Sequence, residues 1–151
     1  MNPKWHIIFG VCFIGIVYLL VPNLSIIGLI IIFLSSILID VDHYLYYVYK
    51  KRDWSLLKSY QWFLRKKKKL DNLTKKQRTK FYTGFAFLHG IEILLLLLLL
   101  STFLSNYFFC IFIGFSFHLI LDYLHQLTWY NRLDKVSLIY DFINSKKLKY
   151  I

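Results

Sequence analysis

The sequence predicts an all-α membrane protein with four transmembrane helices and a basic interfacial loop or helix between the second and third helices. Of the 151 residues, 58% are hydrophobic and 20% are aromatic, which is more than an ordinary soluble domain contains. Four apolar stretches approach the length of about 20 residues that a membrane helix needs. Lys and Arg lie outside these stretches. We therefore expect one integral membrane domain covering residues 1–151.

The first two predicted transmembrane helices cover about residues 5–21 and 24–43, with Pro22 in the turn between them. The first stretch follows Lys4 as a signal peptide would, but no small-residue cleavage site follows it, so a retained helix is favoured. The second stretch is short if it ends at Ile39. It reaches spanning length if the helix continues into the sequence DVDHYLYYVY.

A basic loop is expected over residues 50–80. Its first half alternates apolar and basic residues with helical spacing, which is typical of an amphipathic helix in the membrane interface, with Trp54 and Trp62 near the headgroups. The run RKKKK would attract anionic lipid headgroups, although the charge could also serve only to set the topology. The loop contains no recognisable nucleic-acid-binding module, so we expect lipids and not nucleic acid as partners.

The last two predicted transmembrane helices cover about residues 81–104 and 107–130, and a basic tail follows at residues 131–151. All 19 Lys and Arg residues lie before residue 5, between residues 50 and 80, or after residue 130. With four helices, these three regions lie on the same side of the membrane. The positive-inside rule therefore predicts a protein of the cell membrane with its N- and C-termini in the cytoplasm.

Ionisable residues occur in or beside the apolar stretches, where they are costly and usually functional. All five histidines are among them. The full set is His6, Asp40, Asp42, His43, His89, Glu92, His118, Asp122 and His125.

The spacing of these residues places several on shared helix faces. His118, Asp122 and His125 are separated by four and three residues and form one stripe. His89 and Glu92 are three residues apart, as are Asp40 and His43. We expect these stripes to face the interior of the bundle.

The depth of the polar residues can be estimated from a rise of about 1.5 Å per helical residue. Counted from the basic or aromatic ends of their helices, Asp40, His89 and Asp122 lie at a similar depth in the cytoplasmic leaflet. His6 lies only two residues after Lys4 and is expected to be shallower, unless the first helix is tilted or set deeper.

Imidazoles and carboxylates that converge from several helices suit a divalent metal ion, whose charge offsets the cost of burying the acids. Zinc is the first choice, and manganese or iron could also bind such ligands. The set is larger than one four-coordinate shell, so we expect one or two ions, or additional residues that orient the ligands. The expected metal ligands are His6, Asp40, His43, His89, His118, Asp122 and His125, and the expected catalytic residues are Asp42 and Glu92.

The segments LIDVDHYLYY, FLHGIE and GFSFHLILDYLHQ, together with His6, resemble the YdjM-like family of membrane-bound metal-dependent hydrolases, also known as DUF457. The resemblance runs from His6 to His125 and implies a membrane fold with a metal site and hydrolase activity. Two departures indicate a divergent branch. Ile39 stands where the family often has Pro, and FLHGIE replaces the His-Arg-Gly-x-Thr-His-Ser motif of many members.

These observations predict a membrane-embedded metal-dependent hydrolase. The expected substrate is a phosphoester or a lipid-like amphiphile, attacked by a metal-activated water at the cytoplasmic leaflet. Two alternatives remain open from the sequence. The protein could be a metal or proton transporter, or a metal-binding membrane protein without hydrolytic activity, because a proton relay uses the same residue types. It could also be a structural or assembly protein that binds no metal.

Overall fold

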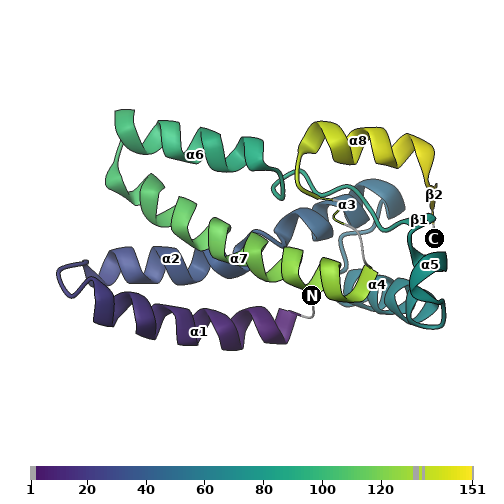
Figure 1. Ribbon diagram of the computed structural model, residues 1–151, viewed down its shortest axis with the longest axis horizontal. Coiled ribbons are helices and arrows are strands. Elements are labelled where there is room, and N and C mark those ends of the chain that lie inside the picture. Colours follow the sequence, from purple (N-terminus) through teal and green to yellow (C-terminus); the bar gives the residue numbers. More distant parts are fainter. Residues whose placement is uncertain (1–2, 131–132, 134, 151) are drawn as a thin grey trace. The chain divides into compact units, whose positions relative to one another are not determined.

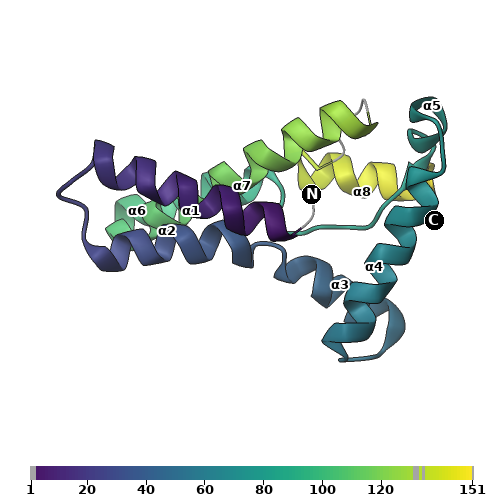
Figure 2. The same ribbon diagram turned by 90° about the horizontal axis from the view of Figure 1, so that it is seen from below.

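The computed structural model describes residues 3–130, 133 and 135–150, and these are mostly helical. The chain folds into two compact units. We call residues 1–39 and 91–124 the apolar unit, and residues 40–90 and 125–151 the basic unit. Figure 1 and Figure 2 show the elements of each unit from two directions.

The apolar unit begins with two helices that lie side by side in both views, α1 (Pro3–Leu20) and α2 (Ile26–Leu38). The turn between them ends at Ser25, whose side chain caps α2 by accepting a hydrogen bond from the Gly28 amide at 3.1 Å. The predicted helices 5–21 and 24–43 correspond to these elements. The second one is interrupted, because a turn at Ile39 and Asp40 separates α2 from the next helix.

Two further helices contribute to the apolar unit, α6 (Ile91–Phe103) and α7 (Asn106–Tyr130) as far as Leu124. At Gly114, α7 approaches α2 so closely that a Cβ atom there would overlap the hydroxyl of Ser35 and lie 2.5 Å from the carbonyl oxygen of Ile32. Small residues allow this kind of contact between backbones, as is common in membrane helices.

Apolar side chains cover much of the outside of these helices. Leu19, Leu20, Ile26 and Phe103 are each more than three-quarters exposed. Two helical stretches are long and apolar enough to cross a membrane: Ile26–Lys51 with 26 residues and Asn106–Trp129 with 24. The helices at Lys4–Leu20 and Ile91–Phe103 are apolar but shorter.

The basic unit contains α3 (Val41–Lys51), α4 (Leu56–Asp71) and α5 (Lys75–Arg78). Ser55 caps α4 by accepting a hydrogen bond from the Lys58 amide. The amphipathic basic helix predicted within residues 50–80 therefore exists as α4. Its apolar side includes Trp62, which packs edge-on against Tyr47 of α3 with ring centroids 5.6 Å apart.

The basic unit also contains α8 (Leu138–Lys147) and two short parallel strands, β1 (Phe81–Tyr82) and β2 (Lys149–Tyr150). β2 follows α8 directly and pairs Lys149 with Phe81. The basic tail is therefore tied, through β2, to the segment that follows the basic loop. The tail residues 131, 132, 134 and 151 lie outside the described part of the chain.

The predicted helix over 81–104 is wrong for its first ten residues, 81–90. Residues 83–90 form an irregular segment, and α6 begins only at Ile91. Two buried carboxylates compete with helix formation here, because Asp141 accepts the Ala86 amide at 3.3 Å and Asp42 accepts the Leu88 amide at 3.0 Å. Gly84 has φ +143°, a conformation that side chains rarely adopt.

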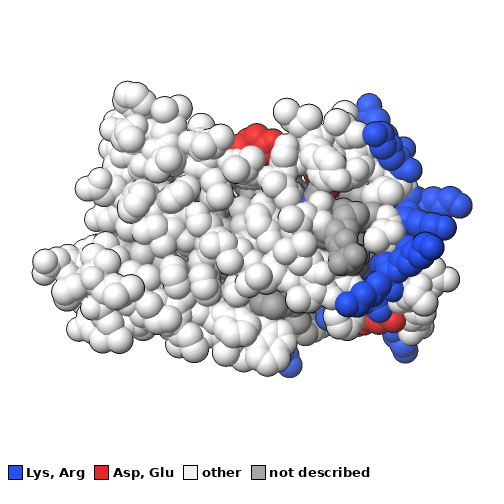
Figure 3. Space-filling model, viewed as in Figure 1, with Lys and Arg blue, Asp and Glu red and all other residues white. Residues whose placement is uncertain are grey.

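The charge is concentrated on the basic unit. Every Lys and Arg except Lys4 belongs to it. Figure 3 shows Lys and Arg gathered where α4, α5 and the end of the chain lie, whereas the surface over α1, α2, α6 and the first part of α7 is almost entirely uncharged. The sequence predicted this separation of charged from apolar segments.

Candidate metal centre

The apolar unit brings three of the predicted ligands together. His6 comes from α1, and His118 and Asp122 come from α7; their exposed fractions are 1%, 0% and 6%. His6 Nε2 lies 3.3 Å from Asp122 Oδ1. The His6 and His118 rings stack with centroids 3.9 Å apart. α1 therefore packs so that His6 reaches Asp122, which fits the alternative of a first helix that is tilted or set deeper.

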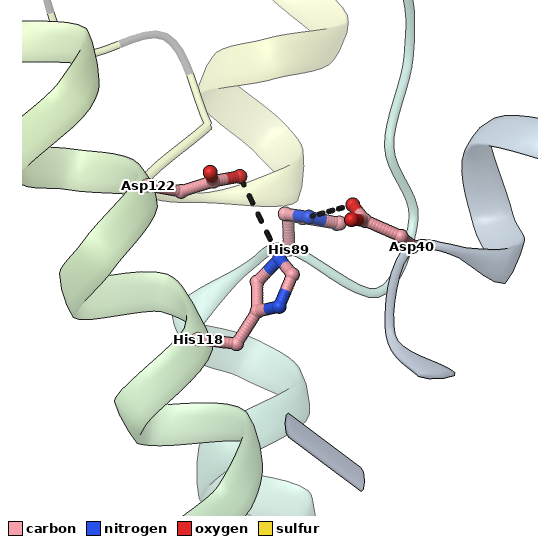
Figure 4. A group of neighbouring side chains, drawn as sticks. All are labelled: Asp40, His89, His118 and Asp122. Atoms are coloured by element: carbon pink, nitrogen blue, oxygen red, sulfur yellow. Dashed lines mark ion pairs between the residues drawn. The ribbon is translucent and has the colours of Figure 1, made fainter. Parts of the chain in front are cut away.

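The orientation of His118 is set by the backbone of α2. Its Nδ1 donates a hydrogen bond to the carbonyl oxygen of Ser36 at 2.7 Å. Since a carbonyl only accepts, Nδ1 carries the proton and a neutral ring has its lone pair on Nε2. That nitrogen lies 3.7 Å from Asp122 Oδ2, the pair marked in Figure 4. A histidine anchored in this way through its other nitrogen is typical of a metal ligand.

The distances in this cluster fit a shared metal ion. Metal–ligand bonds of about 2.0–2.2 Å in tetrahedral geometry place neighbouring ligand atoms about 3.4 Å apart. The two Asp122 distances, 3.3 Å to His6 and 3.7 Å to His118, bracket that value. In addition, His6 Nδ1 is buried with no hydrogen-bond partner among the described residues. A site of this composition is suited to a cation.

The basic unit holds a second cluster, built around Asp42 of α3. Asp42 is fully buried. His89 Nδ1 donates to its Oδ2 at 2.9 Å, and His43 Nδ1 lies 3.1 Å from its Oδ1. The Leu88 amide also donates to Oδ2. One carboxylate thus fixes two imidazole rings, which stack with centroids 4.9 Å apart.

The far nitrogens of these two rings face Asp40. Nε2 of His43 and Nε2 of His89 each lie 3.6 Å from Asp40 Oδ1, and Figure 4 shows the His89–Asp40 pair. These separations are too long for hydrogen bonds and close to the spacing of ligands around one metal ion. Ligand atoms of Asp42, His43 and His89 also lie within 4.8 Å of one another, so this buried His/Asp group could hold a metal ion.

The local fold explains how the second cluster forms. Asp40 occupies the N-cap position of α3, and its carbonyl accepts the His43 amide at 3.1 Å, which places both side chains in the first turn. His89 lies in the turn before α6, where its amide donates to Ala86 O at 3.4 Å.

Two polar residues beside the second cluster were missed by the sequence analysis. Lys135 Nζ lies 3.3 Å from His43 Nε2. Asp141, only 1% exposed, accepts the Ala86 amide and so supports the segment that carries His89. The sequence analysis treated the tail that contains both residues only as a basic segment. In the sequence Asp141 lies on the polar side of its helix, with Asn144 and Ser145, so the pattern gave no signal for its burial.

The remaining predicted residues, Glu92 and His125, do not join the groups of close potential ligands found in the described part of the chain. Glu92 is half-buried in the first turn of α6. His125 is half-buried on α7, with its ring 5.9 Å from that of Trp129. The roles predicted for them stay predictions.

Comparison of the chain with protein-family models, with curated proteins and with solved structures finds no match. The functional interpretation therefore depends on the two clusters themselves.

Proposed function

We propose that this protein is a membrane-embedded metal-dependent hydrolase that acts on a phosphoester or lipid-like amphiphilic substrate at the cytoplasmic leaflet. The observation that carries the proposal is the repeated anchoring of imidazoles through Nδ1. His118 is held by a carbonyl and His89 by a carboxylate, while Nε2 of each ring faces an aspartate oxygen at 3.6–3.7 Å. Ligands of metalloenzymes are oriented in this way.

In this proposal the protein binds one or two zinc ions in total, and each cluster supplies ligands. Manganese or iron are the alternatives. His6, His118 and Asp122 are the ligands in the apolar unit, and Asp40, His43 and His89 are those in the basic unit. A bound divalent ion would polarise the scissile bond and lower the pKa of a water molecule.

The exposure of the other side chains indicates which of them position the ligands and which can accept a proton. Asp42 is completely buried and contacts two imidazoles, which favours a positioning role over the catalytic role predicted from the sequence. The side chains of His43 and Asp40 are 28% and 24% exposed. A water or substrate can reach both, but a His43 ring that binds the ion through Nε2 and faces Asp42 through Nδ1 has no lone pair left for a proton. The second carboxylate oxygen of Asp40 would therefore accept the proton from water.

We also propose that four helices of the protein cross the membrane. α1, with 18 residues, is about 27 Å long and comes close to the hydrocarbon thickness. α6, with 13 residues, is only about 20 Å long, so the irregular residues before it would also lie at membrane depth. Irregular backbone at membrane depth is tolerated where it is buried in protein and its polar groups have hydrogen-bond partners. Asp141 and Asp42 meet that requirement for the Ala86 and Leu88 amides, from which they accept hydrogen bonds.

The resemblance to YdjM-like hydrolases supports the same proposal. The residues quoted for the resemblance, His6, Asp40, His43, His118 and Asp122, contribute to the two clusters. We further propose that the basic loop contacts anionic lipid headgroups and that both termini are cytoplasmic.

The first experiment is elemental analysis of detergent-purified protein. We expect one or two equivalents of metal in the wild type, and a loss of metal in His118→Ala and Asp42→Asn. Loss of an orienting partner alone typically weakens metal binding about 10–100-fold. Asp53→Asn is the matched control, because Asp53 pairs with Lys58 at 3.0 Å near the surface and contacts neither cluster. Metal-free wild-type protein, even after reconstitution with zinc, would refute the proposal.

Activity is tested on the metal-loaded protein with phospholipids and model phosphoesters. Asp122→Asn should abolish turnover and leave the protein folded and inserted, because the amide keeps the volume of the side chain and loses its charge. Full activity in Asp122→Asn would exclude the role assigned to the apolar-unit cluster.

A further inference from the structure

Helix α8 of the basic unit has its polar side turned inward and its apolar side exposed. Asp141 is only 1% exposed and accepts the Ala86 amide at 3.3 Å, and Asn144 and Ser145 on the same side are half-buried. The apolar side consists of four residues with exposed fractions between 41% and 69%: Ile139, Tyr140, Phe142 and Ile143. A surface helix of a water-soluble protein normally packs the other way round.

Two contacts within the basic unit fix this orientation. The first is the hydrogen bond from the Ala86 amide to Asp141, and the second is the pairing of β2, which follows α8 directly, with β1. A rotation of α8 that buried its apolar side would separate the carboxylate from the amide, and a buried donor without a partner is costly. The apolar side of α8 therefore needs apolar surroundings from outside the basic unit.

Lysines follow the apolar residues at the C-terminal end of α8. Lys146 and Lys147 lie in its last turn and Lys149 lies in β2, and all three are exposed. Lys146 Nζ is 4.4 Å from the centre of the Phe142 ring, so the aliphatic part of this side chain lies beside the apolar side. Large apolar residues bordered by lysines are typical of helices that lie in a membrane interface.

The charge of the basic unit selects an anionic lipid surface over a second copy of the chain. The unit contains 18 basic residues and six acids. Two such units would repel each other, whereas anionic headgroups attract basic segments. Two helical stretches of the chain are long and apolar enough to cross a membrane, which would bring lipid within reach of the tail.

We propose that α8 docks on the anionic surface of a lipid bilayer. Ile139, Phe142 and Ile143 insert at the boundary between headgroups and acyl chains, and Lys146 and Lys147 contact the phosphate groups of the headgroups. α8 is then a second interfacial helix, separate from the basic loop. The inference goes beyond the proposed hydrolase function and requires no metal ion, so either proposal can fail without the other.

The test measures the depth of α8 in the membrane with the full-length protein. In a background carrying Cys12→Ala and Cys110→Ala, an environment-sensitive fluorophore is attached at Ile139→Cys or Ile143→Cys. The protein is reconstituted into vesicles of phosphatidylcholine and phosphatidylglycerol, in which some lipids carry a nitroxide quencher near the top of the acyl chain. Asn72→Cys is the reference position, because it is exposed at the polar C-terminal end of α4.

The proposal predicts that the nitroxide quenches the fluorophore at Ile139 and Ile143 at least about twofold more strongly than at Asn72. Equal quenching at all three positions overturns it. A fluorophore at Ile139 that is blue-shifted but not quenched also overturns it, since a second copy of the chain or another protein would then cover the apolar side of α8.

The role of the lysines is tested with two double variants that remove the same charge. Lys146→Gln combined with Lys147→Gln should lower the quenching at Ile139, as should vesicles of phosphatidylcholine alone. Lys75→Gln combined with Lys76→Gln, at exposed positions of α5, should leave it near the wild-type value. Equal quenching in both double variants would overturn the docking of α8 on an anionic surface.

Discussion

At the scale of single residues, the structure distinguishes between histidines that look equivalent in the sequence. His118 is oriented by a backbone carbonyl, His89 by a carboxylate, and His6 has a buried nitrogen with no hydrogen-bond partner among the described residues. These differences decide which nitrogen of each ring can meet a cation. The environment also changes the pKa of charged residues, and Lys66 is the clearest case outside the apolar helices.

Lys66 should react as an unusually nucleophilic amine. Its pKa is lowered from 10.5 to about 8 by burial and by neighbouring lysines. At pH 8 about half of its side chain is therefore neutral, compared with about 0.3% for a lysine of ordinary pKa. We expect Lys66 to be acylated at least about tenfold faster at pH 8 than Lys68, which is exposed on the same helix.

The measurement is peptide mapping by mass spectrometry after short exposure to an amine-acylating reagent between pH 7 and 10. The reaction of Lys66 should show a midpoint near pH 8. Equal rates at Lys66 and Lys68 across this range would contradict the buried environment assigned to Lys66.

At the scale of helices, the geometry of the first cluster depends on how closely α7 approaches α2. The carbonyl of Ser36 can hold His118 only because Gly114, one turn earlier on α7, lets the two backbones come together. Similarly, α1 packs against α2 through Gly10, where an added Cβ atom would lie 3.2 Å from the Ser36 hydroxyl. Small residues thus position the polar ones.

Gly114→Ala should destabilise the protein, because its Cβ atom would overlap Ser35 and crowd the Ile32 carbonyl. Overpacking of this kind costs roughly 1–3 kcal/mol. Gly15→Ala is the matched control, since nothing lies within 4 Å of a Cβ atom at that position of α1. Alanine there is expected to be neutral or to stabilise by up to about 1 kcal/mol through helix propensity.

Thermal unfolding in detergent, followed by circular dichroism, compares the two variants with the wild type. A clear fall in Tm for Gly114→Ala alone is expected. Equal Tm values for both variants would show that α2 and α7 are not in close contact at Gly114.

At the scale of the whole molecule, composition divides the chain into apolar helices with exposed Leu, Ile and Phe, and a unit that holds all but one of the basic residues. This division supports the proposed topology with the basic loop in the cytoplasm. The turns at residues 21–25 and 104–106 would then lie on the outer side.

Cysteine labelling tests this topology. In a background carrying Cys12→Ala and Cys110→Ala, Asn23→Cys should react with a membrane-impermeant maleimide added to intact cells. Asn72→Cys should react only after the cells are opened. Both asparagines are exposed, so accessibility within the protein does not limit either reaction. Labelling of Asn72→Cys in intact cells would contradict the predicted orientation.

The sequence by itself determined the helical class, the apolar segments, the basic amphipathic helix α4 and the residue types of the candidate site. These features follow from composition and from periodicity along a single segment, and both can be read locally. The spacing of His118 and Asp122 already placed them on one face of α7, and the structure has them 3.7 Å apart.

Only the tertiary structure decided where α6 begins, that His6 reaches Asp122 and which side chains join each cluster. The irregular segment before α6 exists because Asp42 and Asp141, distant in sequence, accept its backbone amides. Lys135 meets His43 across 92 positions of the chain. Such contacts depend on which segments pack together, and the free energy of satisfying a buried amide or carboxylate outweighs local helix propensity.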